Sequence, residues 1–254
     1  MRLTLIFLLA SGIVLTGCNR SQSSSSTAST TGGAQPKVAI DPATTGSING
    51  TVHFNGAAPA PIKIDMSFDP ACAMSPRGEN TVSPIAAKDG KLANVFVYVK
   101  VAPFLADWAL PKEHVVVDQV GCRYEPHVVG AMVGQTLEFR NSDSTDHNVH
   151  AAPKNNPEWN QSQTPKSPPI LKRFDMPEIM VPVKCNQHPW MKMYVNVVAS
   201  PMFAVTDANG NFEIKGLPPG EYTIAAVQEK LGERTITVKV AQQEQKKNAD
   251  FSFQ

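Results

Sequence analysis

The amino-acid sequence predicts an all-β protein. Proline and glycine are frequent, at 21 and 16 of 254 residues, and both favour turns over long helices. Valine and threonine recur in short runs, which is typical of strands. No long stretch carries apolar residues at helical spacing. Together these observations indicate a chain of short strands joined by turns.

The composition is that of an ordinary globular protein. Hydrophobic residues make up 42% of the chain, enough for a buried core, and its length suits one large or two modest domains. The 23 basic and 22 acidic residues leave a formal net charge of +1. This balance gives no sign of a nucleic-acid footprint or of a strongly charged docking face.

Residues 1–18 are expected to be a lipoprotein signal peptide. A charged start is followed by an apolar run over residues 3–15, too short for a membrane-spanning helix with a stop-transfer flank. The stretch Leu15-Thr16-Gly17-Cys18 resembles the bacterial lipobox, which implies cleavage before Cys18 and lipid modification of that cysteine. The alternative is a plain secretory signal with a coincidental cysteine.

Residues 19–45 are predicted to form a disordered tether. They are mostly Ser, Thr, Gly and Ala, so burial cannot offset the entropy lost on ordering them. Such a tether would let a globular head move away from the membrane that holds the lipid.

The next segment, residues 46–112, contains two strand signals. Residues 48–54 alternate apolar side chains and end before a Gly and Pro break. Residues 92–100, after an Asp-Gly turn signal, predict the strongest strand of this half. Between them, residues 69–83 look irregular and carry Cys72.

The C-terminal residues predict further strands. Residues 204–214 indicate a hairpin around Asn209-Gly210, and strands are expected within 216–224 and over 235–240. This region resembles the carboxypeptidase regulatory-like family of small Ig-like β-sandwiches. The resemblance implies that the opening strands of such a sandwich lie upstream, so that residues 46–112 and 200–254 form one sandwich split by an insertion. A self-contained C-terminal module is the alternative.

The middle, residues 113–199, holds the residues suited to chemistry. A strand is expected at 115–118, a run of strands over 124–141, and strands at 178–184 and 194–198. Residues 153–167, rich in Asn, Pro and Gln, are predicted to form a long surface loop.

One short stretch, residues 185–191, combines a thiol, an imidazole and a thioether: Cys185, His188 and Met191. With a second imidazole from upstream, His147 being the obvious candidate, this is the ligand set of a mononuclear copper site for electron transfer. The two segments resemble the copper loops of type 1 blue copper proteins, the cupredoxins, and most closely the amicyanins, with plastocyanins more distant. The resemblance implies a Greek-key β-sandwich and a copper ion that cycles between Cu(I) and Cu(II).

Two ligand positions have rivals. His150 competes with His147, and the resemblance favours His147 because amicyanins bind through the first histidine of a similar His-Asn-Val-His run. Met193 competes with Met191 for the weak axial position, and an amicyanin-like spacing of three residues after His188 favours Met191.

Other residues near the site have expected supporting roles. The resemblance implies that Asn148 ties the upstream loop to the cysteine loop, while Pro189 restricts the backbone beside the second histidine. Trp190 is a candidate contact for a redox partner or a packing residue. His53, His114 and His127 have no partner at ligand spacing and are expected to be structural.

The four cysteines can each be given a role. In an exported chain, Cys72 and Cys122 are a candidate disulfide, with two buried free thiols as the alternative. Cys185 then remains as an unpaired thiol, which metal binding would explain.

The sequence therefore predicts a copper-binding electron-transfer protein that is not an enzyme. It is expected to be lipid-anchored on the extracytoplasmic, periplasmic side of the cell envelope. Expected partners are extracytoplasmic redox proteins, such as a c-type cytochrome or a dehydrogenase-like donor or acceptor, and the membrane, but no nucleic acid. The alternatives are a lipoprotein that buffers or delivers copper, and a module without copper that only binds partners. No second histidine cluster suggests a catalytic copper.

Overall fold

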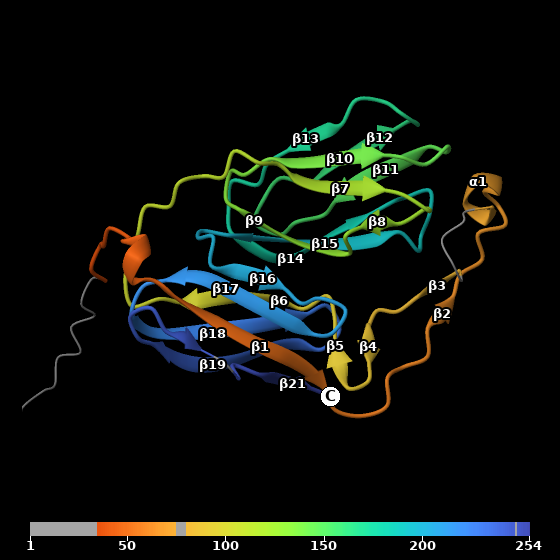
Figure 1. Ribbon diagram of the computed structural model, residues 1–254. Coiled ribbons are helices and arrows are strands. Elements are labelled where there is room, and N and C mark those ends of the chain that lie inside the picture. The colour runs from red at the N-terminus through yellow and green to blue at the C-terminus, as the bar shows by residue number, and fades with distance from the viewer. Residues whose placement is uncertain (1–34, 75–79, 247) are drawn as a thin grey trace, which may run out of the picture. The chain divides into compact units, whose positions relative to one another are not determined.

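The computed structural model describes residues 35–74, 80–246 and 248–254, and their regular secondary structure is almost entirely strand (Figure 1). The all-β prediction is confirmed. Two short helices, η1 (Pro42–Thr44) and α1 (Pro70–Ala73), interrupt the strands. In the described part of the chain, no helix is long and apolar enough to cross a membrane. The expected signal peptide and Cys18 lie outside the described residues.

The first pair of sheets combines strands from both ends of the described chain. One sheet has the order β17-β1-β5-β4, with β20 and β21 also paired to β1, and the other has the order β16-β6-β18-β19. Their buried side chains form one core, which includes Ile48, Tyr222 and Ile224. The strands are β1 (Gly46–Phe54), β4 (Ala87–Lys88), β5 (Lys91–Leu92), β6 (Phe96–Val101), β16 (Phe203–Val205), β17 (Asn211–Leu217), β18 (Gly220–Gln228), β19 (Gly232–Val240), β20 (Gln245–Lys246) and β21 (Phe251–Phe253).

A second pair of sheets is formed by the middle of the chain. The orders are β13-β10-β7-β8 and β12-β11-β14-β15-β9. A second core lies among them and contains the fully buried Leu137 and Phe139. The strands are β7 (Val115–Gln119), β8 (Tyr124–Glu125), β9 (Val128–Met132), β10 (Leu137–Asn141), β11 (His147–Ala151), β12 (Trp159–Gln163), β13 (Ile170–Lys172), β14 (Glu178–Lys184) and β15 (Lys192–Val198).

The segment between β1 and β4 leaves the sheets and forms a feature that we call the strap, residues 62–74 and 80–83 (Figure 1). Its strands β2 (Ile62–Lys63) and β3 (Thr81–Val82) pair with each other in antiparallel register. Helix α1 lies between them in sequence, and its Cys72 forms a disulfide with Cys122. The strap is thereby bonded to the second pair of sheets.

Several local predictions differ from the structure. Residues 35–45, expected to belong to the disordered tether, include η1, and the Val38 N–H donates to the Leu105 carbonyl at 2.8 Å. The single strand expected over 92–100 is divided into β5 and β6, which belong to different sheets. Asn94 between them has a left-handed backbone (φ 59°), and the Thr206 hydroxyl donates to the Leu92 carbonyl while it accepts from the Val95 N–H. These contacts stabilise a bend where a continuous strand was expected.

The expected hairpin at Asn209-Gly210 is also not a two-stranded hairpin. The turn forms, with Gly210 at φ 72°, but β16 pairs with β6 whereas β17 pairs with β1. The Gly210 carbonyl accepts from Val52 N–H at 2.8 Å, so the turn is held by β1. The loop expected at 153–167 likewise contains β12, an edge strand paired with β11.

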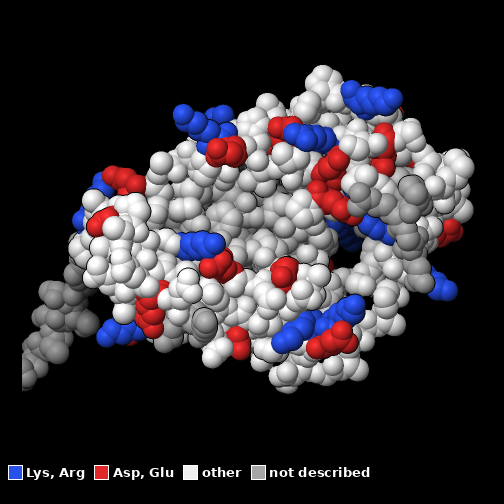
Figure 2. All heavy atoms as spheres, in the orientation of Figure 1, with Lys and Arg blue, Asp and Glu red and all other residues white. Residues whose placement is uncertain are grey.

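Charged side chains are mixed in sign over most of the face shown in Figure 2, and basic and acidic groups lie next to each other. This matches the formal net charge of +1.

Candidate metal centre

Three predicted ligands converge at one end of the second pair of sheets. His147 is the first residue of β11, Cys185 directly follows β14, and His188 lies in the loop that leads to β15. All three are buried, with relative exposures of 0%, 2% and 2%. The two histidine Nδ1 atoms lie 2.9 Å apart, and Cys185 Sγ lies 3.6 Å from His188 Nδ1. The structure therefore brings two imidazoles and one thiol to a single buried point.

The loop that carries Cys185 and His188 is closed by its own backbone. The Cys185 N–H donates to the Met191 carbonyl at 3.1 Å, and the Met191 N–H donates to the His188 carbonyl at 2.9 Å. Beyond this closure β14 and β15 pair directly, with Lys184 opposite Lys192. The spacing of the ligand atoms is thus set by a short, hydrogen-bonded turn at the end of a two-stranded ladder.

Both imidazole rings are oriented by carboxylates on their outer nitrogens. His147 Nε2 lies 2.8 Å from Asp143 Oδ2, and His188 Nε2 lies 3.0 Å from Asp69 Oδ2. If each Nε2 carries the proton that it donates to its carboxylate, the two Nδ1 lone pairs face each other. A proton on one Nδ1, or a cation between the two, removes this repulsion. Carboxylate–histidine pairs of this kind orient metal-ligating imidazoles.

The donor set fits a soft or borderline transition-metal ion. Ion–nitrogen distances of about 2.0 Å and ion–sulfur distances of about 2.3 Å place two donors on one ion roughly 3–4 Å apart. The measured separations, 2.9 and 3.6 Å, are close to that range. Thiolate and imidazole together favour copper or zinc over the hard ions magnesium and calcium.

In the metal-free cluster Cys185 and His147 form a thiolate–imidazolium pair, and a metal ion would displace the extra proton of His147. Burial alone would raise the pKa of the Cys185 thiol, but hydrogen bonds with His147 and His188 outweigh it and lower the pKa to about 6. Burial likewise opposes the charge on His147, but hydrogen bonds with Asp143 and Cys185 raise its pKa to about 9. Cys185 is therefore a thiolate at neutral pH, the form in which cysteine binds metals.

Asn148 connects the two ligand-bearing segments. Its backbone N–H donates to Cys185 Sγ at 3.4 Å, and its side-chain oxygen accepts from the Asn186 N–H. Its side-chain amide also donates to Asn160 on β12. A hydrogen bond to a thiolate sulfur withdraws electron density from it. Asn148 can therefore both align the two loops and lower the electron density on the Cys185 sulfur.

Met191 and Met193 are both completely enclosed, at 1% and 0% exposure. Met191 lies within the closed loop, where its carbonyl accepts from Cys185 N–H, whereas Met193 lies one step farther along the ladder, opposite Val183. The backbone therefore places Met191 nearer to Cys185.

His150 is not part of the cluster. Its Nδ1 faces the Asn186 side-chain oxygen at 3.0 Å, and its Nε2 faces Glu158 at 2.6 Å. The other histidines also have partners outside the cluster: Asp250 for His53, Glu138 for His114 and Glu229 for His127.

Trp190 is half-buried beside the cluster. Its Nε1–H donates to the Cys122 carbonyl at 3.0 Å, and its ring centroid lies 5.2 Å from that of His188 and 5.3 Å from that of Phe68. The backbone of the preceding residue, Pro189, belongs to the same closed loop. Trp190 therefore contacts both the second imidazole and the strap.

The strap residues that cover His188 were not among the predicted site residues. Asp69 is the first residue of the segment that looked irregular, and Phe68, whose ring is stacked on His188 at 6.1 Å between centroids, directly precedes it. Asp69 is 119 positions from His188, and only the neighbouring Cys72 hinted that this segment would reach the site. Asp143, four residues before His147, could have been found from that spacing.

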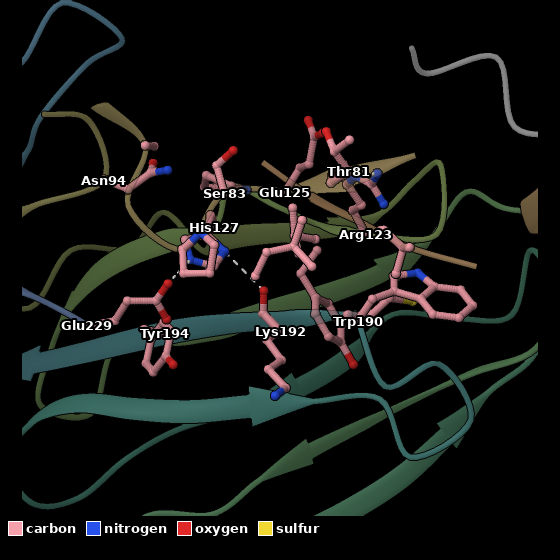
Figure 3. Close-up of a pocket in the computed structure, with 18 of the residues that line it drawn as sticks. Thr81, Ser83, Asn94, Arg123, Glu125, His127, Trp190, Lys192, Tyr194 and Glu229 are labelled. Carbon is pink, nitrogen blue, oxygen red and sulfur yellow. Dashed lines mark hydrogen bonds and ion pairs between the residues drawn. The ribbon is translucent and has the colours of Figure 1, made fainter. Parts of the chain in front are cut away.

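A separate cavity of about 830 Å³ lies between the strap and the strands β8 and β15 (Figure 3). His127 projects into it and links two walls: its Nδ1–H donates to the Lys192 carbonyl at 3.0 Å, and its Nε2 lies 3.3 Å from Glu229. The Trp190 ring forms part of the lining. The cavity thus adjoins the ligand loop: Met191 is among its lining residues, whereas His147, Cys185 and His188 are not.

No protein-family model matches the chain, and no curated protein matches it in sequence. Three similar solved structures are the Cu-containing nitrite reductase (NirK) from Thermus scotoductus SA-01, a mutant of amicyanin in the Cu(I) form, and a novel purple cupredoxin from Nitrosopumilus maritimus. Their sequence identities are 24%, 24% and 21%, and their TM-scores are 0.31, 0.30 and 0.29.

The similarity to these structures is partial. It covers 39%, 33% and 33% of this chain, in the same order, and 25%, 81% and 98% of the other chain. The chain therefore matches only a quarter of the length of the nitrite reductase. The similar structures include copper proteins of the cupredoxin type.

Proposed function

We propose that this protein binds one copper ion, which His147, Cys185 and His188 would hold with Met191 as a weak fourth ligand, and that it passes single electrons between larger redox proteins. The observation that carries the proposal is the convergence of two carboxylate-oriented imidazoles and one thiolate at a buried point. Two imidazoles and a thiolate in this combination are characteristic of electron-transfer copper sites.

Copper would supply the one-electron couple, Cu(II)/Cu(I), and the chain's own residues would keep the site fixed around it. Asp143 and Asp69 hold the imidazoles by Nε2, so that neither ring needs to rotate when the charge changes. The Asn148 N–H holds the sulfur. Burial of all three ligands excludes water, which limits rearrangement of solvent during electron transfer.

The same features favour a shuttle over a copper-delivery protein. Delivery requires that a ligand can leave, and here each ligand has a second contact that restrains it. No catalytic role is proposed, so electrons would leave and enter through protein partners, with Trp190 as a candidate contact.

The proposed setting is extracytoplasmic. A disulfide between Cys72 and Cys122 is typical of oxidising compartments. The signal-peptide and lipobox pattern of residues 1–18 supports export and a lipid anchor at Cys18 in the cell envelope.

The proposal is tested by loading the protein with Cu(II) and recording its EPR spectrum and cyclic voltammogram, followed by challenge with a copper chelator. A shuttle gives a narrow copper hyperfine splitting, one reversible one-electron wave and copper retained over repeated cycles. Rapid loss of copper to the chelator without a reversible wave would instead favour buffering or delivery.

A further inference from the structure

The Asp69 carboxylate is held by donors from three parts of the chain. Its Oδ1 accepts from the backbone N–H groups of Ala71 and Cys72, at 2.8 and 3.3 Å, and so caps helix α1. Its Oδ2 accepts from the Thr145 hydroxyl at 2.7 Å and lies 3.0 Å from His188 Nε2. Each oxygen thus has a separate role, and the carboxylate has little freedom to rotate.

The strap that carries Asp69 is anchored at the same place. Cys72, three residues later, is bonded to Cys122, and its Sγ lies 3.6 Å from His188 Nε2. On the other side, the Phe68 ring is stacked nearly parallel to the imidazole, with 19° between the planes. His188 is therefore enclosed by the strap, and only 3% of its side chain is exposed.

Each imidazole is oriented by a carboxylate, but the two carboxylates come from different parts of the fold. Asp143 belongs to the turn that leads directly into His147, so that contact is local. Asp69 reaches His188 from a segment inserted between β1 and β4, far away in sequence. One of the two carboxylates that orient the ligands thus comes from the strap, which lies outside the second pair of sheets.

We propose that Asp69 is a positioning residue of the metal centre: it accepts the Nε2 proton of His188, directs Nδ1 towards the metal ion, and lowers the reduction potential by its negative charge. This rests on the proposed copper function. Oxidation leaves one more positive charge on the ion, so a fixed carboxylate close to a ligand favours the oxidised state. Replacing the carboxylate should therefore favour Cu(I).

The test compares three variants. Asp69→Asn keeps an oxygen that can accept from Nε2–H but removes the charge, and Asp69→Ala removes both. Asp65→Asn is the matched control, because Asp65 lies on the same strap and accepts from the Ser67 N–H rather than from the metal cluster. Thiol titration checks that the disulfide is intact in every variant.

The first measurement needs no copper: hydrogen exchange of the histidine ring N–H protons, followed by NMR in ¹⁵N-histidine-labelled, metal-free protein. The His188 Nε2–H should be protected in the wild type, Asp65→Asn and Asp69→Asn, and should exchange at least tenfold faster in Asp69→Ala. Equal protection in wild type and Asp69→Ala would overturn the positioning role. If Asp69→Ala does not fold, Asp69→Ser takes its place, because a serine hydroxyl can still cap α1 but is too short to reach His188. Faster exchange of the His188 Nε2–H in Asp69→Ser would support the positioning role, and exchange as slow as in the wild type would overturn it.

The second measurement is the reduction potential of the copper-loaded proteins. Asp69→Asn should shift the Cu(II)/Cu(I) equilibrium about tenfold towards Cu(I), a rise of about 59 mV, while Asp65→Asn stays close to wild type. Equal potentials for Asp69→Asn and Asp65→Asn would overturn the electrostatic role. A wild-type protein with no reversible copper couple would refute the proposed function instead, and the exchange measurement would still decide the Asp69–His188 contact.

Discussion

Removing the disulfide that anchors the strap should destabilise the protein strongly. Cys72 and Cys122 are 50 residues apart in sequence. Closing a loop of that length reduces the entropy of the unfolded chain by about 14 cal/mol/K, which corresponds to about 4 kcal/mol at 25 °C. The double variant Cys72→Ala, Cys122→Ala should lose stability of this order. Alanine is chosen because a serine hydroxyl would be buried at both positions.

The assay is equilibrium unfolding of the metal-free protein in guanidinium chloride, followed by circular dichroism. The variant's midpoint should fall, and its slope m should rise, because the unfolded chain is less compact without the bond. Repeating the comparison with a thiol reductant is the control, because the wild type should then unfold like the variant.

Two outcomes would refute this reasoning. A loss of less than about 1 kcal/mol would mean that the bond does not constrain the unfolded chain as the entropic account requires. A difference that persists under full reduction would mean that the substitutions act through packing and not through the bond.

Three further predictions concern the core, a buried carboxylate and the choice of histidine. Leu137→Ala, at a fully buried position, should cost about 2–5 kcal/mol in urea unfolding, whereas Leu171→Ala, 55% exposed, should cost far less; equal losses would contradict the assigned core. Burial opposes the charge on Glu178, but hydrogen bonds from residues 154–156 hold its pKa below the usual value. The ionised carboxylate therefore stabilises the folded protein above the unfolded pKa, about 4.3. This stabilisation is lost as pH falls through the lower folded pKa. Glu178→Gln should therefore be less stable than wild type at pH 6 and approach it near pH 3, and a constant gap in unfolding free energy would contradict this. His147→Ala should abolish stoichiometric copper uptake in a titration, whereas His150→Ala should bind normally, and the reverse result would exchange their roles.

The all-β class could be predicted because composition and strand periodicity depend on local sequence. The ligand loop could also be predicted from the sequence, because Cys185, His188 and Met191 lie within seven residues of one another. His147 required the resemblance to a known pattern, because nothing local relates it to Cys185.

What could not be predicted depends on tertiary contacts. The bend at Asn94 is stabilised by Thr206, more than a hundred residues away. Residues 159–163 form a strand only because they pair with β11. Asp69 reaches His188 through a strap whose path is set by a disulfide. Sequence patterns report local preference, and these three features arise from distant partners.

The proposed copper site depends on Cys185, which would bind copper as a thiolate between two imidazoles. It is tested most directly by the visible absorption spectrum of the Cu(II)-loaded protein beside that of Cys185→Ser, which replaces sulfur by oxygen at the same position. We expect an intense thiolate-to-copper charge-transfer band in the wild type and none in the variant. A variant that keeps the band, or a copper-loaded wild type without it, would show that copper is not bound through the Cys185 thiolate.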